Sequence, residues 1–230
     1  MGSSRHREAR QAEVTRNDRA LLEAARRVFA RDGRHATVAA IADEAGVGVG
    51  SLYRRYSSKD DLFRALLNHS NEQWANAAER ALADPDPWQG LAGFIIECVE
   101  FGQGTLAPLA DEIDGAPEPD ETSQRADTAF QDMIQRAHQA GVLRPDATAV
   151  DIILLIEQLG RSPLLEQLRL QGRTGLLADA QDARRRIIAV ALDGLHRAPQ
   201  TALPGEPPSS DLVEARWAGR PEQCSSRRRS

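Results

Sequence analysis

The chain has 230 residues, of which 41% are hydrophobic and 27% charged, and its formal net charge is -5 at pH 7. This length is enough for one sizeable core or two smaller ones. It contains no apolar run near the roughly 20 residues that a membrane helix needs and no secretory core, and its cysteines, Cys98 and Cys224, make no disulfide framework. We therefore expect a cytoplasmic protein with reduced thiols and no contact with a membrane.

Composition and charge indicate an all-α protein with one basic end. Ala, Leu, Arg, Glu and Gln dominate, which favours helix over strand. Residues 1–64 carry 13 Lys and Arg against 9 Asp and Glu, whereas the rest of the chain carries 16 against 25. A basic end on an acidic body suits a protein that presents one face to phosphate.

The N-terminal region begins with a polar, arginine-rich stretch, residues 1–14. We interpret it as a disordered arm, which either reaches into a DNA minor groove or binds nothing. A first helix is predicted from near Thr15 to near Asp32, because apolar residues recur there at helical spacing and Gly33 follows.

The next stretch predicts two short helices joined by a glycine turn. Thr37 is a good N-cap for the first of them, and Gly46 ends it. The second contains apolar or aromatic residues at offsets of three and four, and Ser57 or Ser58 then caps a long helix over residues 58–83. Two short helices around a glycine turn form a helix-turn-helix, whose second helix enters a DNA major groove.

The motifs of this stretch resemble one known family. They are Ala45-Gly46-Val47, Gly50-Ser51-Leu52-Tyr53, the aromatic Tyr56 and Ser58-Lys59-Asp60-Asp61-Leu62. Together they are similar to the DNA-binding domain of TetR-family transcriptional regulators, over about residues 15–64. The resemblance implies a three-helix DNA-binding domain at 15–64 and a helical ligand-binding and dimerisation domain at 65–197. The chain departs from the family at Gly48, where members often carry a capping Ser.

Residues that match the family's DNA-contact positions are Thr37, Val49, Gly50, Ser51, Tyr53, Arg54, Arg55 and Lys59. Hydroxyl, ammonium and helix-start amide groups suit phosphate contact, which is expected of Thr37, Tyr53 and Lys59. Small side chains allow close approach to base edges, which is expected of Gly50 and Ser51. Arg54 and Arg55 are candidates for guanine or phosphate contact.

Further helices are predicted in the body at 88–104, 122–140, 146–160 and 182–196, with Asp146 capping the third. Residues 105–115 suggest a short helix, 116–121 a proline-rich loop and 198–230 a disordered tail. The resemblance implies a homodimer in which the helices at 146–160 and 182–196 pair across a two-fold axis. The alternative is that their apolar residues are buried within one subunit.

The resemblance also implies a small-molecule effector in the body. The candidate lining residues are His69, Trp74, Phe94, Cys98, Phe101, Phe130, Met133 and Ile134. The alternative for each of them is an ordinary place in the core.

The five histidines lack metal-ligand spacing, and no nucleophile or phosphate-loop motif occurs, so we expect no enzyme, no metal and no cofactor. The predicted function is a sequence-specific regulator of transcription, a repressor that a small molecule releases from a palindromic operator in double-stranded DNA. The alternative is a DNA-docked adaptor that binds a protein partner through its body.

Overall fold

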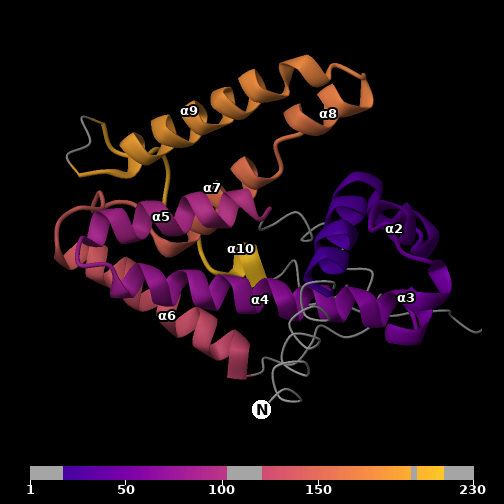
Figure 1. Cartoon of the computed structure of the whole chain (residues 1–230). Helices are drawn as coiled ribbons and strands as arrows, with labels where there is room; N and C mark the ends of the chain where they lie inside the picture. The colour runs from indigo at the N-terminus through magenta and orange to yellow at the C-terminus, as the bar shows by residue number, and fades with distance from the viewer. Residues whose placement is uncertain (1–17, 103–120, 198–200, 215–230) are drawn as a thin grey trace, which may run out of the picture.

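The computed structural model describes residues 18–102, 121–197 and 201–214 of the chain. Within these ranges all regular secondary structure is helical, apart from an isolated bridge between Leu143 and His196. The all-α prediction is confirmed, and none of the helices described there is long and apolar enough to cross a membrane. A small N-terminal unit and a larger helical body share one long helix, α4 (Figure 1).

The N-terminal unit comprises the first helix, described over residues 18–32, and three further elements before α4. They are η1 (Gly33–His35), α2 (Val38–Glu44) and α3 (Val49–Arg55). Gly33 and Gly46 adopt positive φ angles of 55° and 66°, as predicted for residues that end helices. Thr37 is the predicted N-cap of α2, and its Oγ1 accepts from the Ala40 N–H at 3.1 Å.

Helix α4 (Lys59–Ala83) confirms the long helix predicted over residues 58–83. The Ser58 side chain caps it by accepting from the Asp61 N–H at 3.0 Å. Its first half packs in the core of the N-terminal unit through Leu62, Phe63, Leu66 and Leu67, and its second half packs in the core of the body from Trp74 onward.

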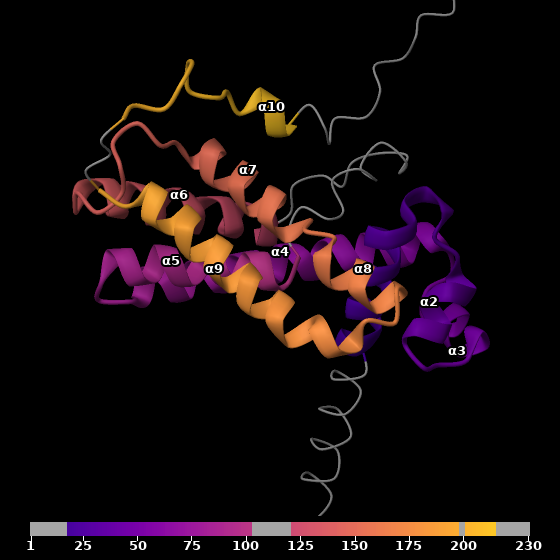
Figure 2. The same ribbon diagram turned by 90° about the horizontal axis from the view of Figure 1, so that it is seen from above.

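The body is built around the second half of α4. The remaining elements are α5 (Pro87–Glu100), α6 (Glu121–Gln139), α7 (Ala149–Gly160), α8 (Leu164–Leu170), η3 (Thr174–Leu176), α9 (Leu177–Leu195) and α10 (Asp211–Glu214). Helices α5 and α6 pack on α4, α7 packs on α5, and α8 packs on α9. Figure 2 shows α8 on the side of the body that is nearer to the N-terminal unit.

Helices α4 and α5 approach each other closely at Gly90. A Cβ atom at this position would overlap the carbonyl oxygen of Ala81 on α4. The absence of a side chain therefore lets the two backbones meet, whereas Gly93, one turn later, faces open space.

Two predicted helix starts in the body were wrong. Helix α7 begins at Ala149 rather than at 146, and Thr148 caps it in a reciprocal capping box with Asp151. Asp146, the predicted cap, instead accepts from Arg144 Nε at 2.6 Å. Helix α9 begins at Leu177 rather than at 182, and α8 was not predicted at all.

The structure describes only part of the segments that were predicted at the two ends of the chain and at residues 105–121. The arm at 1–14, the short helix at 105–115 and most of the loop at 116–121 lie outside the described residues, although Glu121 begins α6. Within the predicted tail, residues 201–214 are described. The Leu203 N–H donates to Asp146 Oδ2 at 2.9 Å, and Arg144 Nη2 donates to the Thr201 carbonyl at 2.9 Å.

Candidate nucleic-acid interface

A tight turn sets α3 against α2. Within it, the Val47 N–H donates to the Ala42 carbonyl at 2.9 Å, and the Gly46 N–H donates to the Asp43 carbonyl at 3.0 Å. This pair of bonds is the Schellman arrangement, which requires the positive φ of Gly46. The turn therefore fixes the direction in which α3 leaves α2.

Helix α3 buries one side chain and exposes the rest. Leu52 is buried in the core of the N-terminal unit, whereas Val49, Gly50, Ser51, Tyr53 and Arg54 are exposed. Tyr53 is 53% exposed although it is aromatic. This outward face carries a phenol, a hydroxyl, a guanidinium and small groups, a combination that can read base edges and bind phosphate.

Ser51 and Arg54 form a pair on this face. Arg54 Nη2 donates to Ser51 Oγ at 2.8 Å, one helical turn apart. The hydrogen bond holds the guanidinium along the helix surface, beside the hydroxyl of Ser51.

Two polar helix starts precede and follow α3 along the chain. Thr37 is exposed at the start of α2, where its Oγ1 accepts from the Ala40 N–H and its O–H group can still donate to a phosphate. Lys59 is the first residue of α4, with its ammonium 5.7 Å from the centroid of the Phe29 ring. Both sites combine helix-start amides with a polar side chain, which favours anion binding.

Ion pairs tie the helices of this unit together. Arg55, at the end of α3, pairs with Asp18 of the first helix. Arg27 Nε pairs with Glu44 of α2 at 2.7 Å. Arg55 is thus engaged within the N-terminal unit, a role that the sequence did not reveal because Asp18 lies far from it along the chain.

Most of the predicted effector residues pack against one another in the body core. The rings of Trp74 and Phe94 lie 4.8 Å apart between centroids, those of Trp74 and Phe130 5.1 Å, and those of Phe94 and Phe130 5.6 Å. Met133, Ile134 and Cys98 are buried beside them. Burial raises the pKa of the Cys98 thiol well above its usual value, so this side chain stays protonated.

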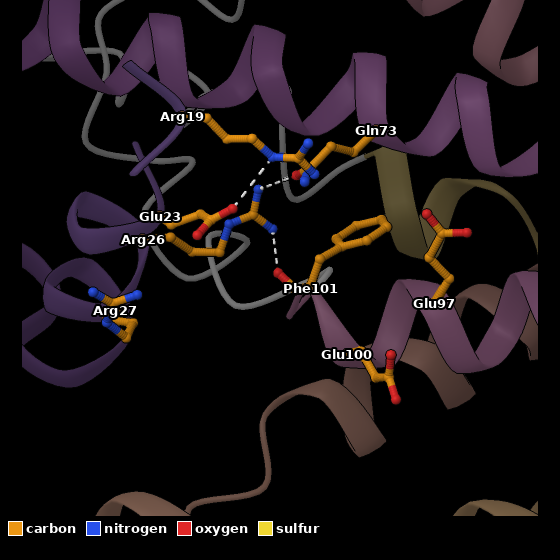
Figure 3. Close-up of a pocket in the computed structure, with 8 residues that line it drawn as sticks. All are labelled: Arg19, Glu23, Arg26, Arg27, Gln73, Glu97, Glu100 and Phe101. Carbon is orange, nitrogen blue, oxygen red and sulfur yellow. Dashed lines mark hydrogen bonds and ion pairs between the residues drawn. The ribbon is translucent and has the colours of Figure 1, made fainter. Parts of the chain in front are cut away.

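The two other predicted effector residues line grooves where the N-terminal unit meets the body. Phe101 lines a groove of about 440 Å³ with Arg19, Glu23, Arg26, Arg27, Gln73, Glu97 and Glu100 (Figure 3). His69 lines a second groove, of about 370 Å³, that shares Arg19, Gln73 and Glu97 with the first. Burial and the nearby Arg26 and Arg19 lower the pKa of His69, so its imidazole is neutral at pH 7.

Arg26 is a buried polar residue that the sequence analysis missed. It is 7% exposed and lies four residues after Leu22 and three before Phe29, on the apolar stripe of the first helix. A charged residue at a core-facing position of such a stripe is the signal that could have revealed it.

Comparison with known proteins agrees with this geometry. Residues 21–66 match the family model described as bacterial regulatory proteins, tetR family. The chain is 30% identical over 145 residues to the HTH-type transcriptional repressor KstR2 of Mycobacterium tuberculosis, covering 58% of this chain and 72% of that protein. It is 27% identical over 111 residues to the HTH-type regulator YfiR of Bacillus subtilis, covering 46% of this chain and 51% of the relative.

Solved structures show the same fold. The TetR regulator SCO0520 of Streptomyces coelicolor has a TM-score of 0.53 at 23% identity, over 79% of this chain and 99% of that chain. The structure of KstR2 from Mycobacterium tuberculosis has a TM-score of 0.50 at 21% identity, over 79% and 95% of the respective chains. With the matched DNA-binding region and the relative aligned over most of its length, the chain belongs to the TetR family of transcriptional regulators and is a DNA-binding protein rather than an enzyme.

Proposed function

We propose that the chain is a homodimeric repressor in the cytoplasm, which binds a palindromic operator through two copies of α3 and is released by a small effector held in the body. The observation that carries the proposal is the exposed face of α3 with Ser51, Tyr53 and Arg54, preceded along the chain by the helix start at Thr37 and followed by the one at Lys59. Relatives that are named repressors, such as KstR2, support the sign of regulation.

In this proposal seven of the eight predicted residues divide into two groups, and Arg55 stands apart. Thr37, Tyr53 and Lys59 bind phosphates and set the position of α3 in the major groove. Val49, Gly50, Ser51 and Arg54 lie at the base edges, where a bidentate guanidinium can select guanine. Arg55 contacts DNA while it remains paired with Asp18, or holds α3 in place for the others.

The dimer is proposed to form through α7 and α9. Ile187 and Val190 on α9 are 55% and 73% exposed, which is unusual for two aliphatic side chains three residues apart on one helix. Helix α7 adds half-buried aliphatic residues at 153–155. A second copy that covers both helices would bury these groups and place two α3 helices one turn of DNA apart, about 34 Å.

The effector is proposed to be small and mainly apolar, because the candidate residues around Trp74, Phe94 and Phe130 are aromatic or aliphatic. Its binding would separate these packed rings and shift the body to a conformation in which the two α3 helices no longer fit the operator. The free energy of DNA binding that is lost equals the difference between the effector's binding free energies for the two conformations.

Selection of bound sequences from random duplex DNA by the purified full chain tests the proposal. A two-fold symmetric motif with half-sites about one helical turn apart is the expected result. Weak binding without a motif, which decreases steeply with salt, would contradict an operator-specific repressor. In that case the adaptor function, with a protein partner on the body, would be preferred.

A further inference from the structure

The N-terminal unit and the body have separate hydrophobic cores, although α4 belongs to both. The core of the N-terminal unit ends along α4 at Leu67, and the core of the body begins at Trp74. Between them lie six residues with polar side chains, which we call the α4 waist: Asn68, His69, Ser70, Asn71, Glu72 and Gln73. Because the two clusters are distinct, polar contacts at the waist must help to set how the N-terminal unit sits on the body.

Arg26, on the first helix, contacts the α4 waist through its guanidinium. Its Nη2 donates to Ser70 Oγ at 2.7 Å and to Gln73 Oε1 at 3.0 Å. Ser70 is itself oriented, since its hydroxyl donates to the Leu66 carbonyl at 2.8 Å. The guanidinium therefore fits a donor-acceptor pattern that α4 holds in place.

Arg26 also reaches the end of α5. Its Nη1 donates to the carbonyl oxygen of Phe101 at 2.7 Å, and the guanidinium lies 5.6 Å from the centroid of the Phe101 ring (Figure 3). Phe101 is the C-cap residue of α5, where helix carbonyls lack partners within the helix. A cation at this end also interacts favourably with the helix dipole and with the face of the ring.

The contacts of Arg26 are sensitive to small displacements. All three hydrogen-bond acceptors are neutral oxygens; two of them lie on the α4 waist and the third at the end of α5. Burial lowers the pKa of Arg26 to about 10, with Glu23 acting in the opposite direction, so the side chain is still charged at pH 7. A buried charge that loses a hydrogen bond is costly, so a shift of the α5 end relative to the first helix is resisted.

We infer that Arg26 is a positioning residue that couples the N-terminal unit to the body, by holding the first helix to the α4 waist and to the end of α5. A change in the body that displaces Phe101 would then move the N-terminal unit with it. This deepens the proposed function, because it names the contact through which an effector in the body would reach α3, but the coupling itself can be tested without DNA.

The first experiment measures whether the two parts unfold together. Arg26→Met keeps a long, flexible side chain but replaces the guanidinium with a thioether, which removes the three hydrogen bonds. Arg27→Met is the matched control, because Arg27 is the next residue and pairs with Glu44 inside the N-terminal unit. Far-UV circular dichroism follows all helices, and tryptophan fluorescence in a Trp217→Phe background follows Trp74 and Trp88 in the body.

In the parent chain and in Arg27→Met, the thermal midpoint from circular dichroism should coincide with the midpoint from tryptophan fluorescence, as expected for one cooperative unit. In Arg26→Met, the circular dichroism signal should begin to fall first, with midpoints separated by about 5 °C or more. Arg26→Lys should give a smaller separation, because an ammonium keeps the charge but lacks the fork that reaches both helices. Gln73→Ala, which removes one acceptor, should act in the same direction if Arg26→Met does not fold.

A simple structural role would lower both midpoints of Arg26→Met together, and that result would overturn the inference. Separate midpoints in the parent chain would overturn it as well. These outcomes do not depend on DNA binding, so they are distinct from a failure to select an operator.

The second experiment uses the selected operator and hydrogen exchange. DNA should slow the exchange of amides in α2 and α3 of every variant that binds it. It should also slow exchange at residues 95–102 in the parent chain and in Arg27→Met, but not in Arg26→Met. Equal protection of residues 95–102 in Arg26→Met and in the parent chain would show that the signal does not pass through Arg26.

Discussion

Tyr53 presents its phenol on the exposed face of α3, and its proposed role is one hydrogen bond to a phosphate. Tyr53→Phe removes only the hydroxyl, so we expect the Kd for DNA to rise about fivefold, equivalent to about 1 kcal/mol, to the same extent on every sequence. Titration of the selected operator and of base-substituted operators measures this. A changed base preference would contradict the phosphate role.

Arg54 belongs to the proposed base-reading group, so its substitution should behave differently. Arg54→Ala also releases Ser51 from its hydrogen bond, so selectivity at the contacted base pair should fall by about 1–3 kcal/mol. Repeating the selection with this variant measures the loss. A motif unchanged in every position would exclude Arg54 from base reading.

The hydrogen-bonded carboxylate of Asp146 makes the stability of the chain depend on pH. Hydrogen bonds from Arg144 and from the Leu203 N–H hold the pKa of Asp146 well below its usual value. The folded-state pKa is thus lower than the unfolded value of about 4, so the stabilisation is present above pH 4 and is lost as the pH falls towards the folded pKa.

Asp146→Asn should therefore lower the Tm at pH 7, and the difference from the parent chain should shrink as the pH is lowered from about 5 to 2. Thermal scans across this range measure it. Asp132→Asn, at an exposed position of α6, is the control and should leave the Tm almost unchanged at every pH. A difference for Asp146→Asn that stays constant with pH would contradict the assignment.

At the scale of elements, the turn between α2 and α3 contains two glycines that differ in whether a side chain would be tolerated in their place. Gly48 is the N-cap of α3 with a φ of -71° and open space around it, but it has no side chain to cap the helix. Gly48→Ser should stabilise the chain by a few tenths of a kcal/mol. Gly46→Ala, at a φ of 66°, should destabilise it by about 1 kcal/mol. Urea unfolding measures the change in the free energy of unfolding for each variant. Changes of the same sign in the two variants would contradict this account.

The contact between α4 and α5 gives a second matched pair of glycines. Gly90→Ala introduces a Cβ that overlaps the Ala81 carbonyl, so it should destabilise the chain by about 1–3 kcal/mol. Gly93→Ala, on the exposed side of the same helix, should stabilise it by about 0.5–1 kcal/mol because alanine favours helix. Denaturant midpoints of the two variants should move in opposite directions.

The sequence predicted elements best where local signals were strong. Thr37, Gly46 and Ser58 mark helix ends through bonds made within a few residues, and the structure confirms all three. Asp146 failed as a cap because its carboxylate accepts instead from Arg144, two residues before it, and from the N–H of Leu203, which is far away along the chain. Helix α8 was missed because it is short and has no buried residue, which leaves no clear apolar stripe to detect.

The candidate site was predictable only in part for a related reason. The exposed residues of α3 follow from one motif in one stretch of chain. The pairing of Arg55 with Asp18 and the contacts of Arg26 with Ser70 and Phe101 join residues that are far apart in the sequence. Periodicity in the sequence predicts which face of a helix such residues occupy, but it does not predict which distant residues they contact.

At the scale of the whole molecule, the proposed dimer makes the exposed aliphatic residues of α9 essential for operator binding. Val190→Glu should yield a monomer by light scattering, with unchanged helix content and at least about tenfold weaker operator binding, because the two half-sites are no longer linked. Leu212→Glu makes the same kind of change at an exposed residue of α10 and should leave the dimer intact. A dimer that survives Val190→Glu with unchanged affinity would contradict an interface centred on α9.

The unbroken path of α4 through both cores has a consequence for changes in chain length. An α-helix turns by about 100° and rises 1.5 Å with each residue. A single residue inserted or deleted between Leu67 and Trp74 would therefore leave each core intact while it rotates one against the other by more than a quarter of a turn. Point substitutions in this short stretch adjust how firmly the two parts are held, whereas its length sets the direction in which α3 faces.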